Sequence, residues 1–286
     1  NKIKMNKKVI LMILDGWGKS PDPKVSAIDN ANIPFINSLY TKYPNASLRT
    51  DGLHVGLPEG QMGNSEVGHM NLGAGRIVYQ DLVKVNLAVK NKTLNKEKVL
   101  VDAFKYAKEK NKDVHFLGLL SDGGVHSHIS HLFGLLEAAN DYGLTNTFVH
   151  AFTDGRDVDP KSGFGFLTEL EEELKKTNSK LATVTGRYYA MDRDKRWERI
   201  KLAYDALVNG IGELSTNVTE SVKKNYSNDI TDEFIKPIIM VDKNNIPVAK
   251  IKEGDVVIFF NFRTDRGREL TEVLTQNDFH EQNMHT

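Results

Sequence analysis

Five short segments of the sequence combine acidic residues, histidine or arginine, and each follows a short apolar run. They are residues 15–18, 121–128, 153–157, 187–193 and 262–266. Arginine side chains suit an anionic ligand, because the guanidinium group holds a carboxylate or a phosphate through two hydrogen bonds. The five segments therefore predict one or two clefts in which a small anion binds.

Each segment also has a structural interpretation. An Asp-Gly pair after a strand, as at Asp15, is ordinary turn chemistry, and arginines after strands are commonly solvated. His126, His128 and His131 have the spacing of a polar loop or helix cap as well as that of metal ligands. Ser65 is by default a helix N-cap. The functional interpretation gains weight because these residue types recur at equivalent strand ends.

The apolar runs that precede the five segments have the length and composition of buried strands. These runs are residues 9–14, 114–120, 147–152, 181–184 and 256–260. Helical patterns lie between many of them, at residues 34–43, 96–110, 130–140, 163–176, 195–209 and 266–274. Strands alternating with helices predict an α/β fold with a mainly parallel sheet. Ligands of such sheets bind beyond the carboxyl ends of the strands.

Residues 50–75 differ from the rest of the chain, since they are rich in glycine and have little hydrophobic periodicity. Glycine allows the backbone to approach a ligand or another backbone closely, so this segment is interpreted as a functional loop. A flexible linker is the alternative. Residues 76–89 have a helical pattern that leads into a different unit, which places a domain boundary near residues 76–81.

Composition excludes several classes of protein. The 286 residues include 38 Lys+Arg and 38 Asp+Glu, and this balance argues against a general nucleic-acid binder. The absence of cysteine excludes disulfides, thiolate metal sites and cysteine nucleophiles. No apolar run approaches the roughly 20 residues that span a bilayer. We therefore expect a cytoplasmic protein with no nucleic-acid or membrane partner.

Familiar catalytic motifs are also missing. The sequence contains no P-loop, dinucleotide-binding fingerprint, Gly-x-Ser-x-Gly elbow or His-Glu-x-x-His motif. The missing motifs therefore argue against ATPase, dehydrogenase, lipase-type hydrolase and zincin activities.

Six blocks of the sequence, in matching order, resemble the cofactor-independent phosphoglycerate mutases of the alkaline-phosphatase-like superfamily. They are LDGWG at 14–18, GNSEVGH at 63–69, SDGGVHSH at 121–128, DGRD at 154–157, GRYYAMDR at 186–193 and NFRTDR at 261–266. The resemblance implies an α/β chain in which the first piece of a phosphatase-like domain is followed by an inserted α/β phosphotransferase domain. We place the first piece at residues 1–78 and the insertion at residues 79–286.

The resemblance also implies roles for individual residues. Ser65 is expected to be the nucleophile that carries the phosphoryl group between 3- and 2-phosphoglycerate, and Asp15 and Ser65 are expected to be metal ligands. Two Mn²⁺ ions, or Mg²⁺ or another divalent metal, are implied as cofactors, without 2,3-bisphosphoglycerate. We expect phosphoglycerate as the small-molecule partner and a monomeric state. The residues expected to bind substrate are His126, Arg156, Asp157, Arg187, Arg193, Arg263 and Arg266.

The same resemblance predicts that this chain is a fragment, because the family's remaining metal ligands and a substrate lysine would follow Thr286. Two other functions stay open. One is a metal-dependent phosphohydrolase or phosphopentomutase on the same superfamily core, which the arginine-rich blocks disfavour. The other is a domain that binds phosphoglycerate without turnover.

Overall fold

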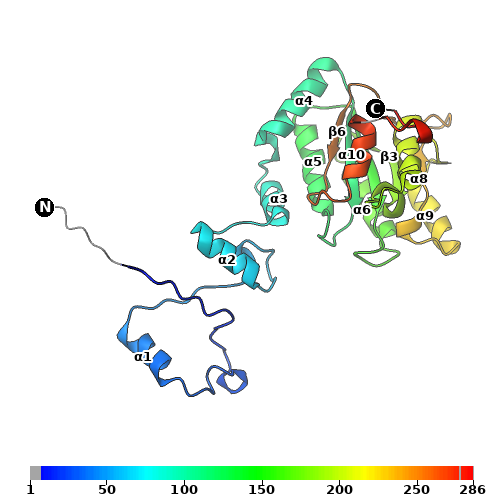
Figure 1. Cartoon of the computed structure of the whole chain (residues 1–286). Helices are drawn as coiled ribbons and strands as arrows, with labels where there is room; N and C mark the ends of the chain where they lie inside the picture. The colour runs from blue at the N-terminus through cyan, green and yellow to red at the C-terminus, as the bar shows by residue number, and fades with distance from the viewer. Residues whose placement is uncertain (1–7, 277, 286) are drawn as a thin grey trace. The chain divides into compact units, whose positions relative to one another are not determined.

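The structure is a computed structural model that describes residues 8–276 and 278–285 (Figure 1). It comprises two compact units, Asn1–Val83 and Lys84–Thr286. The domain limit predicted between residues 78 and 79 remains a prediction. The two units are described separately.

The second unit is built around a six-stranded sheet with the order β4-β5-β3-β2-β1-β6. Strands β3, β2, β1 and β6 are parallel to one another, whereas β5 pairs antiparallel with β3 and parallel with β4. The predicted α/β fold with a mainly parallel sheet is confirmed. The strands are β1 Val114–Leu120, β2 Thr147–Thr153, β3 Ser179–Gly186, β4 Glu213–Ser215, β5 Ile238–Met240 and β6 Val256–Phe259.

Helices cover both faces of this sheet (Figure 1). The α-helices of the chain are α1 Pro34–Lys42, α2 Ser65–Ala74, α3 Asp81–Lys90, α4 Lys98–Lys110, α5 Ile129–Asp141, α6 Gly163–Leu174, α7 Arg187–Ala190, α8 Trp197–Tyr204, α9 Val218–Ser227 and α10 Arg268–Thr275. Helix α8 continues as a π-helical segment, Asp205–Asn209. The short 3-10 helices are Pro23–Val25, Gly52–Val55, Leu94–Lys96, Asp232–Phe234 and His280–Gln282.

Alternation along the strands produces two cores. Phe116 of β1 belongs to the core formed with α4, α5, α6 and α9. Leu117 and Leu119 of the same strand belong to the core formed with α7, α8 and α10. Every residue of β1 is buried, which explains its continuous apolar sequence: a strand covered on both faces has no solvated side.

The first apolar run does not form a strand, so this prediction is wrong. The side chains of residues 9–14 are between 43% and 89% exposed and belong to no sheet of the described residues. A strand exists only where a neighbouring backbone accepts and donates its hydrogen bonds. Apolar composition identified a segment suited to a sheet, but no described strand pairs with it.

The glycine-rich segment of the first unit is folded tightly on itself. A Cβ on Gly56 would lie 2.1 Å from the carbonyl oxygen of Val78, and a Cβ on Gly63 would lie 1.7 Å from that of Thr50. The expectation that glycine permits close backbone approach is confirmed. The segment also contains α2, whose N-cap is Asn64, with its side chain accepting from the amide of Val67 at 2.9 Å. Ser65 is the first helical residue and is not the N-cap.

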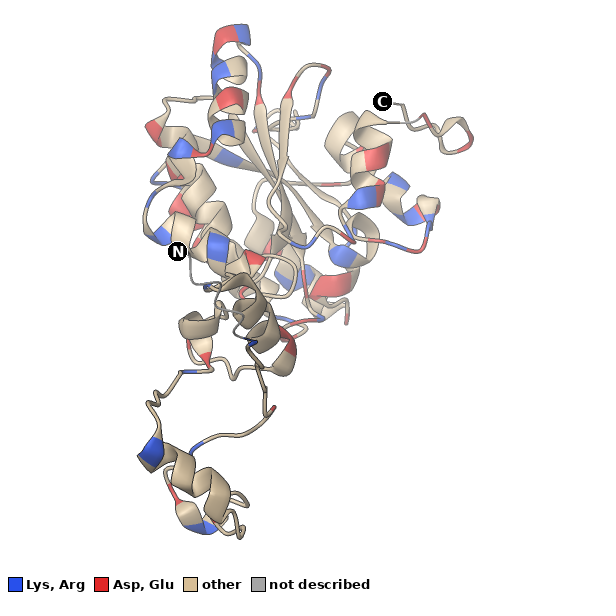
Figure 2. Ribbon diagram, turned by 60° about the vertical axis from the view of Figure 1, so that its left-hand side comes forward, with Lys and Arg blue, Asp and Glu red and all other residues tan. Residues whose placement is uncertain are grey.

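The described residues contain no helix long and apolar enough to cross a membrane. Basic and acidic residues are interspersed along helices of the second unit, as the colours of the ribbon in Figure 2 show. On α4, for example, Lys98 pairs with Asp102 and Lys105 with Glu109.

Candidate anion-binding site

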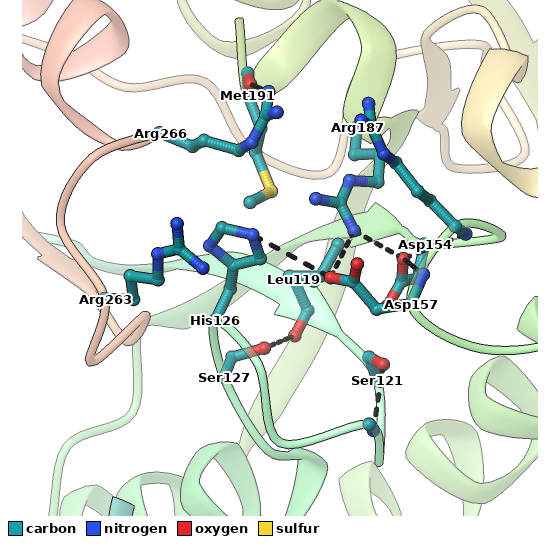
Figure 3. Close-up of polar contacts among 12 residues, drawn as sticks. Leu119, Ser121, His126, Ser127, Asp154, Asp157, Arg187, Met191, Arg263 and Arg266 are labelled. Atoms are coloured by element: carbon teal, nitrogen blue, oxygen red, sulfur yellow. Dashed lines mark hydrogen bonds and ion pairs between the residues drawn. The ribbon is translucent and has the colours of Figure 1, made fainter. Parts of the chain in front are cut away.

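Four parallel strands of the second unit bring their carboxyl ends to one edge of the sheet. The loop after β1 carries His126, and the loop after β2 carries Asp154 and Asp157. Arg187 opens α7 directly after β3, and Arg263 follows β6. Figure 3 shows that these side chains converge although they are far apart in the sequence. This is the edge at which open α/β sheets bind ligands.

Arg187 is the buried centre of the site. Its Nη1 donates to Asp154 Oδ1 and to Asp157 Oδ2, both at 2.6 Å, and its side chain is 3% exposed. Burial tends to lower the pKa of Arg187, but the two carboxylates outweigh it and raise the pKa. Burial tends to raise the pKa of Asp154, yet hydrogen bonds from the Asp157 amide, Ser121 and Arg187 lower it. Arg187 and Asp154 are therefore both ionised, and they are held together by a short, buried ion pair.

His126 lies between two carboxylates. Its Nε2 is 3.8 Å from Asp157 Oδ2, and its Nδ1 is 3.6 Å from Asp265 Oδ1. Burial, followed by the charge of Arg187, lowers the pKa of the imidazole, although Asp157 and Asp265 oppose this shift. The ring is therefore neutral at physiological pH.

Asp265 joins two arginines at the other side of His126. Arg263 approaches it with Nε 3.0 Å from Oδ1 and Nη2 3.1 Å from Oδ2. Arg193 Nη1 donates to the same Oδ2 at 3.3 Å. Burial opposes a low pKa for Asp265, but Arg263 and His126 prevail and lower it.

Arg266 shows that positive charge dominates part of this site. Its Nη1 donates to the carbonyl oxygen of Met191 at 3.0 Å, a neutral partner (Figure 3). Burial, then the positive charges of Arg193, Arg187 and Arg156, lower its pKa. A guanidinium in such surroundings is stabilised by an added anion. The site thus has the electrostatics of an anion receptor.

Arg156 is the most exposed of the predicted substrate-binding residues in an ion pair. Its Nη1 lies 3.7 Å from Glu233 Oε1, and its side chain is 55% exposed. The other predicted residues, His126, Asp157, Arg187, Arg193, Arg263 and Arg266, are linked by contacts or by mutual charge effects.

Two carboxylates of the site, Asp154 and Asp265, were not among the predicted site residues. Both stand inside sequence blocks that were singled out, next to arginines. A carboxylate within a few residues of an arginine, in a loop at a strand end, is the signal that could have identified them. The three histidines that follow β1 have different roles, and only His126 belongs to this site. His128 is the N-cap of α5. His131 is buried, and its Nε2 lies 2.6 Å from Oδ1 of Asn86.

The first unit contains a separate polar constellation. Ser65 Oγ donates to Asp15 Oδ2 at 2.7 Å, so the structure brings the two predicted metal ligands together. His69 Nδ1 lies 3.2 Å from the same Oγ and 2.8 Å from the Ser65 carbonyl oxygen. Ser65 and Asp15 are exposed, and Ser65 stands in the first turn of α2, where free amides favour a negative charge.

These oxygen atoms fit a hard divalent metal in part. A carboxylate and a hydroxyl oxygen so close together can share one cation, and oxygen donors suit Mn²⁺ or Mg²⁺. A different carboxylate–histidine group, Asp113, His115 and Asp255, has ligand atoms within 4.8 Å of one another. The group lies where β1 and β6 begin, at the opposite edge of the sheet from the anion site. Asp255 accepts hydrogen bonds from the backbone amides of Asp113 and Lys252.

The fold and the site together define the class: an α/β protein with a cluster of arginines, suited to a small anion, at the carboxyl edge of its sheet. A profile of the family described as BPG-independent PGAM N-terminus matches residues 85–286. The chain belongs to this family of 2,3-bisphosphoglycerate-independent phosphoglycerate mutases.

Similar proteins agree with this assignment. The chain is 74% identical over 281 residues to the 2,3-bisphosphoglycerate-independent phosphoglycerate mutase of Flavobacterium johnsoniae, covering 98% of this chain and 56% of that protein. It is 56% identical over 282 residues to the enzyme of Bacteroides fragilis, covering 99% and 55%. The chain thus spans about half the length of the curated relatives it matches.

A solved structure is also similar. The phosphoglycerate mutase of Leishmania mexicana, crystallised at low cobalt concentration, matches with a TM-score of 0.70 and 34% identity, covering 88% of this chain and 48% of that chain. The predicted fold class, a phosphatase-like piece followed by an α/β domain, is confirmed by this likeness and by the family match.

Proposed function

We propose that this chain is part of an enzyme that interconverts 3-phosphoglycerate and 2-phosphoglycerate without 2,3-bisphosphoglycerate. The observation that carries the proposal is the candidate anion site of the second unit, in which Arg266 donates to a carbonyl oxygen and three neighbouring arginines outweigh the opposing charge of Asp265. A phosphoglycerate carries a phosphate and a carboxylate, and both groups match guanidinium donors.

The substrate would be bound by arginines of two kinds. Arg266 and Arg156 are weakly neutralised and are available to an incoming anion. Arg193 and Arg263 are paired with Asp265, and Arg187 is fixed by Asp154 and Asp157, so these three hold the shape of the site. His126 and Asp157 would face the glycerate hydroxyls, and Asp157 would serve as the acid or base there.

Ser65 would take the phosphoryl group as a phosphoserine and return it to the other hydroxyl of the retained glycerate. Its hydroxyl already donates to Asp15, which orients the oxygen, and the amides of the first turn of α2 would stabilise the transferred phosphoryl charge. Asp15 and Ser65 would contribute ligands to one of two divalent metals, Mn²⁺ by preference. Such a metal lowers the pKa of a bound hydroxyl and offsets phosphate charge.

The names of the relatives support a role in glycolysis. A cytoplasmic location and a monomeric state are part of the same proposal. Phosphoglycerate is its only proposed small-molecule partner.

Calorimetric titration of the chain with 3-phosphoglycerate tests the anion site. Arg266→Ala should weaken binding about 10-fold or more, because a charge-assisted hydrogen bond contributes about 1.5–3 kcal/mol. Arg49→Ala is the matched control, since Arg49 is exposed in the first unit and pairs with Asp51. Equal loss in both variants, or binding of 3-phosphoglycerate no tighter than that of ribose 5-phosphate, would contradict the proposal.

A further inference from the structure

The ring of His126 has two nitrogens in different surroundings. Nδ1 is sealed from solvent without a hydrogen bond, and it faces Oδ1 of Asp265 at 3.6 Å, an oxygen that also lies 3.0 Å from Arg263 Nε. Among the described side chains, Nε2 is not one of these sealed atoms; it lies on the side of Asp157, as Figure 3 shows. The imidazole itself is 4% exposed, so water cannot satisfy Nδ1.

The sealed Nδ1 and the carboxylate oxygen that it faces decide where the single ring proton lies. A bare Nδ1 would direct its lone pair at that oxygen and would stay a buried, unsatisfied acceptor. A proton on Nδ1 directs an N–H dipole at the same oxygen instead. Asp157 Oδ2, 3.8 Å from Nε2, accepts from Arg187, but Nε2 differs from Nδ1 in that it is not a sealed, partnerless atom, so the burial argument applies to Nδ1.

We infer that Asp265 is a positioning residue that holds His126 in the Nδ1–H tautomer and leaves Nε2 as the nitrogen that exchanges a proton with a bound ligand. Asp265 is itself oriented by Arg263 and Arg193. The amide of Arg263 donates to the His126 carbonyl oxygen at 3.2 Å, which ties the two loops together. When Nε2 takes up a proton from a ligand hydroxyl or from water, the ring becomes an imidazolium whose Nδ1–H still faces Asp265.

The tautomer belongs to the chain itself, whereas the identity of the ligand rests on the proposed function. The lowered pKa of His126 agrees with a neutral ring, for which a choice of tautomer exists. The charged groups that act on the ring are Arg187 and Arg263, which disfavour a second proton, and Asp157 and Asp265, which favour one.

Nitrogen-15 NMR of the histidine-labelled chain tests the inference, because protonated and bare ring nitrogens have distinct chemical shifts. His126→Gln identifies the signals of His126. We expect Nδ1 protonated and Nε2 bare in the wild type. Asp265→Asn, which removes the charge and adds an N–H donor, should move a measurable fraction of the proton to Nε2, and Asp265→Ala should do the same.

Asp157→Asn is the matched control, because Asp157 faces the other side of the ring, and it should leave Nδ1 protonated. A wild type protonated on Nε2 would overturn the inference without any variant being needed. It would also be overturned if both Asp265 variants, folded as judged by the remaining histidine signals, kept the wild-type tautomer.

Addition of 3-phosphoglycerate then separates the inference from the proposed function. Nε2 should shift toward its protonated position while Nδ1 stays protonated. A shift confined to Nδ1 would refute the role given to Nε2. Failure of the ligand to move any signal of the site would count against phosphoglycerate as substrate, whereas the tautomer assigned from the wild-type and variant spectra would stand.

Discussion

Carboxylate partners determine how the arginines of this site are used. Asp154 is 1% exposed and accepts from Arg187, and Asp265 accepts from Arg193 and Arg263. An arginine with a carboxylate partner is fixed in place, and one without is available to a ligand. Removing one partner of the buried pair of Arg187 and Asp154 leaves an uncompensated charge, so Asp154 is a structural requirement of the site and not a spare acid.

Ser65 is the residue on which the proposed covalent route depends. In the complete protein, Ser65→Ala should lower conversion of 3- to 2-phosphoglycerate by at least about a thousandfold, because no phosphoserine can form. A coupled assay measures this loss, and circular dichroism checks that the fold is kept. Ser47→Ala, another exposed serine of the first unit, should retain activity. Near-normal turnover by the Ser65 variant would exclude the phosphoserine.

At the scale of elements, α2 matters because it presents Ser65. Asn64 caps the helix and Gly63 packs against Thr50, so the residues before the nucleophile are held from both sides. The contact between Ser65 and Asp15, 50 positions earlier, is then possible because the start of the helix is fixed.

Two glycines near the start of α2 should respond oppositely to alanine. Gly63→Ala would place a Cβ 1.7 Å from the Thr50 carbonyl oxygen, which forces the backbone apart, and should destabilise the first unit by more than about 1 kcal/mol. Gly68 lies inside α2 with nothing within 4 Å of its Cβ position. Gly68→Ala should therefore stabilise the helix by about 0.5–1 kcal/mol. Amide hydrogen exchange within α2 measures both changes, and similar protection in the two variants would contradict this account.

At the scale of the whole molecule, buried histidines make stability depend on pH. Burial, followed by the charge of His128, lowers the pKa of His131 to about 4 from its ordinary value of 6.5. Between these values the unfolded chain binds a proton that the folded chain refuses. The free energy of unfolding therefore falls as the pH drops from 6.5 to 4, and burial of His115, His126 and His150 acts in the same direction.

Urea unfolding at several pH values measures this dependence. His131→Gln can keep a hydrogen bond to Asn86 but cannot titrate, so the slope of unfolding free energy against pH should fall by up to about 1.4 kcal/mol per pH unit. His280→Gln is the control, because His280 is exposed and its loss should leave the slope unchanged. An unaltered slope in the His131 variant would show that another group carries the effect.

Much of the secondary structure of the second unit could be predicted, because each of its longer strands has an apolar pattern within its own short stretch of sequence. The runs at 114–120, 147–152, 181–184 and 256–260 correspond to strands β1, β2, β3 and β6, and their apolar pattern is visible without neighbours. The short strands β4 and β5 and helix α9 were not predicted. A strand of three residues has too little pattern to recognise, and it forms because the sheet beside it supplies hydrogen bonds.

The sequence by itself determined the α/β class and the residue types at the strand ends, since periodicity and loop position depend on residues close together in the chain. Only the tertiary structure decided which charges meet. Arg187 pairs with Asp154, 33 positions away, and Arg193 with Asp265, 72 positions away. The run at 9–14 likewise has strand composition but no described partner. Pairing is a property of segments that folding brings together, so a pattern within one segment cannot specify it.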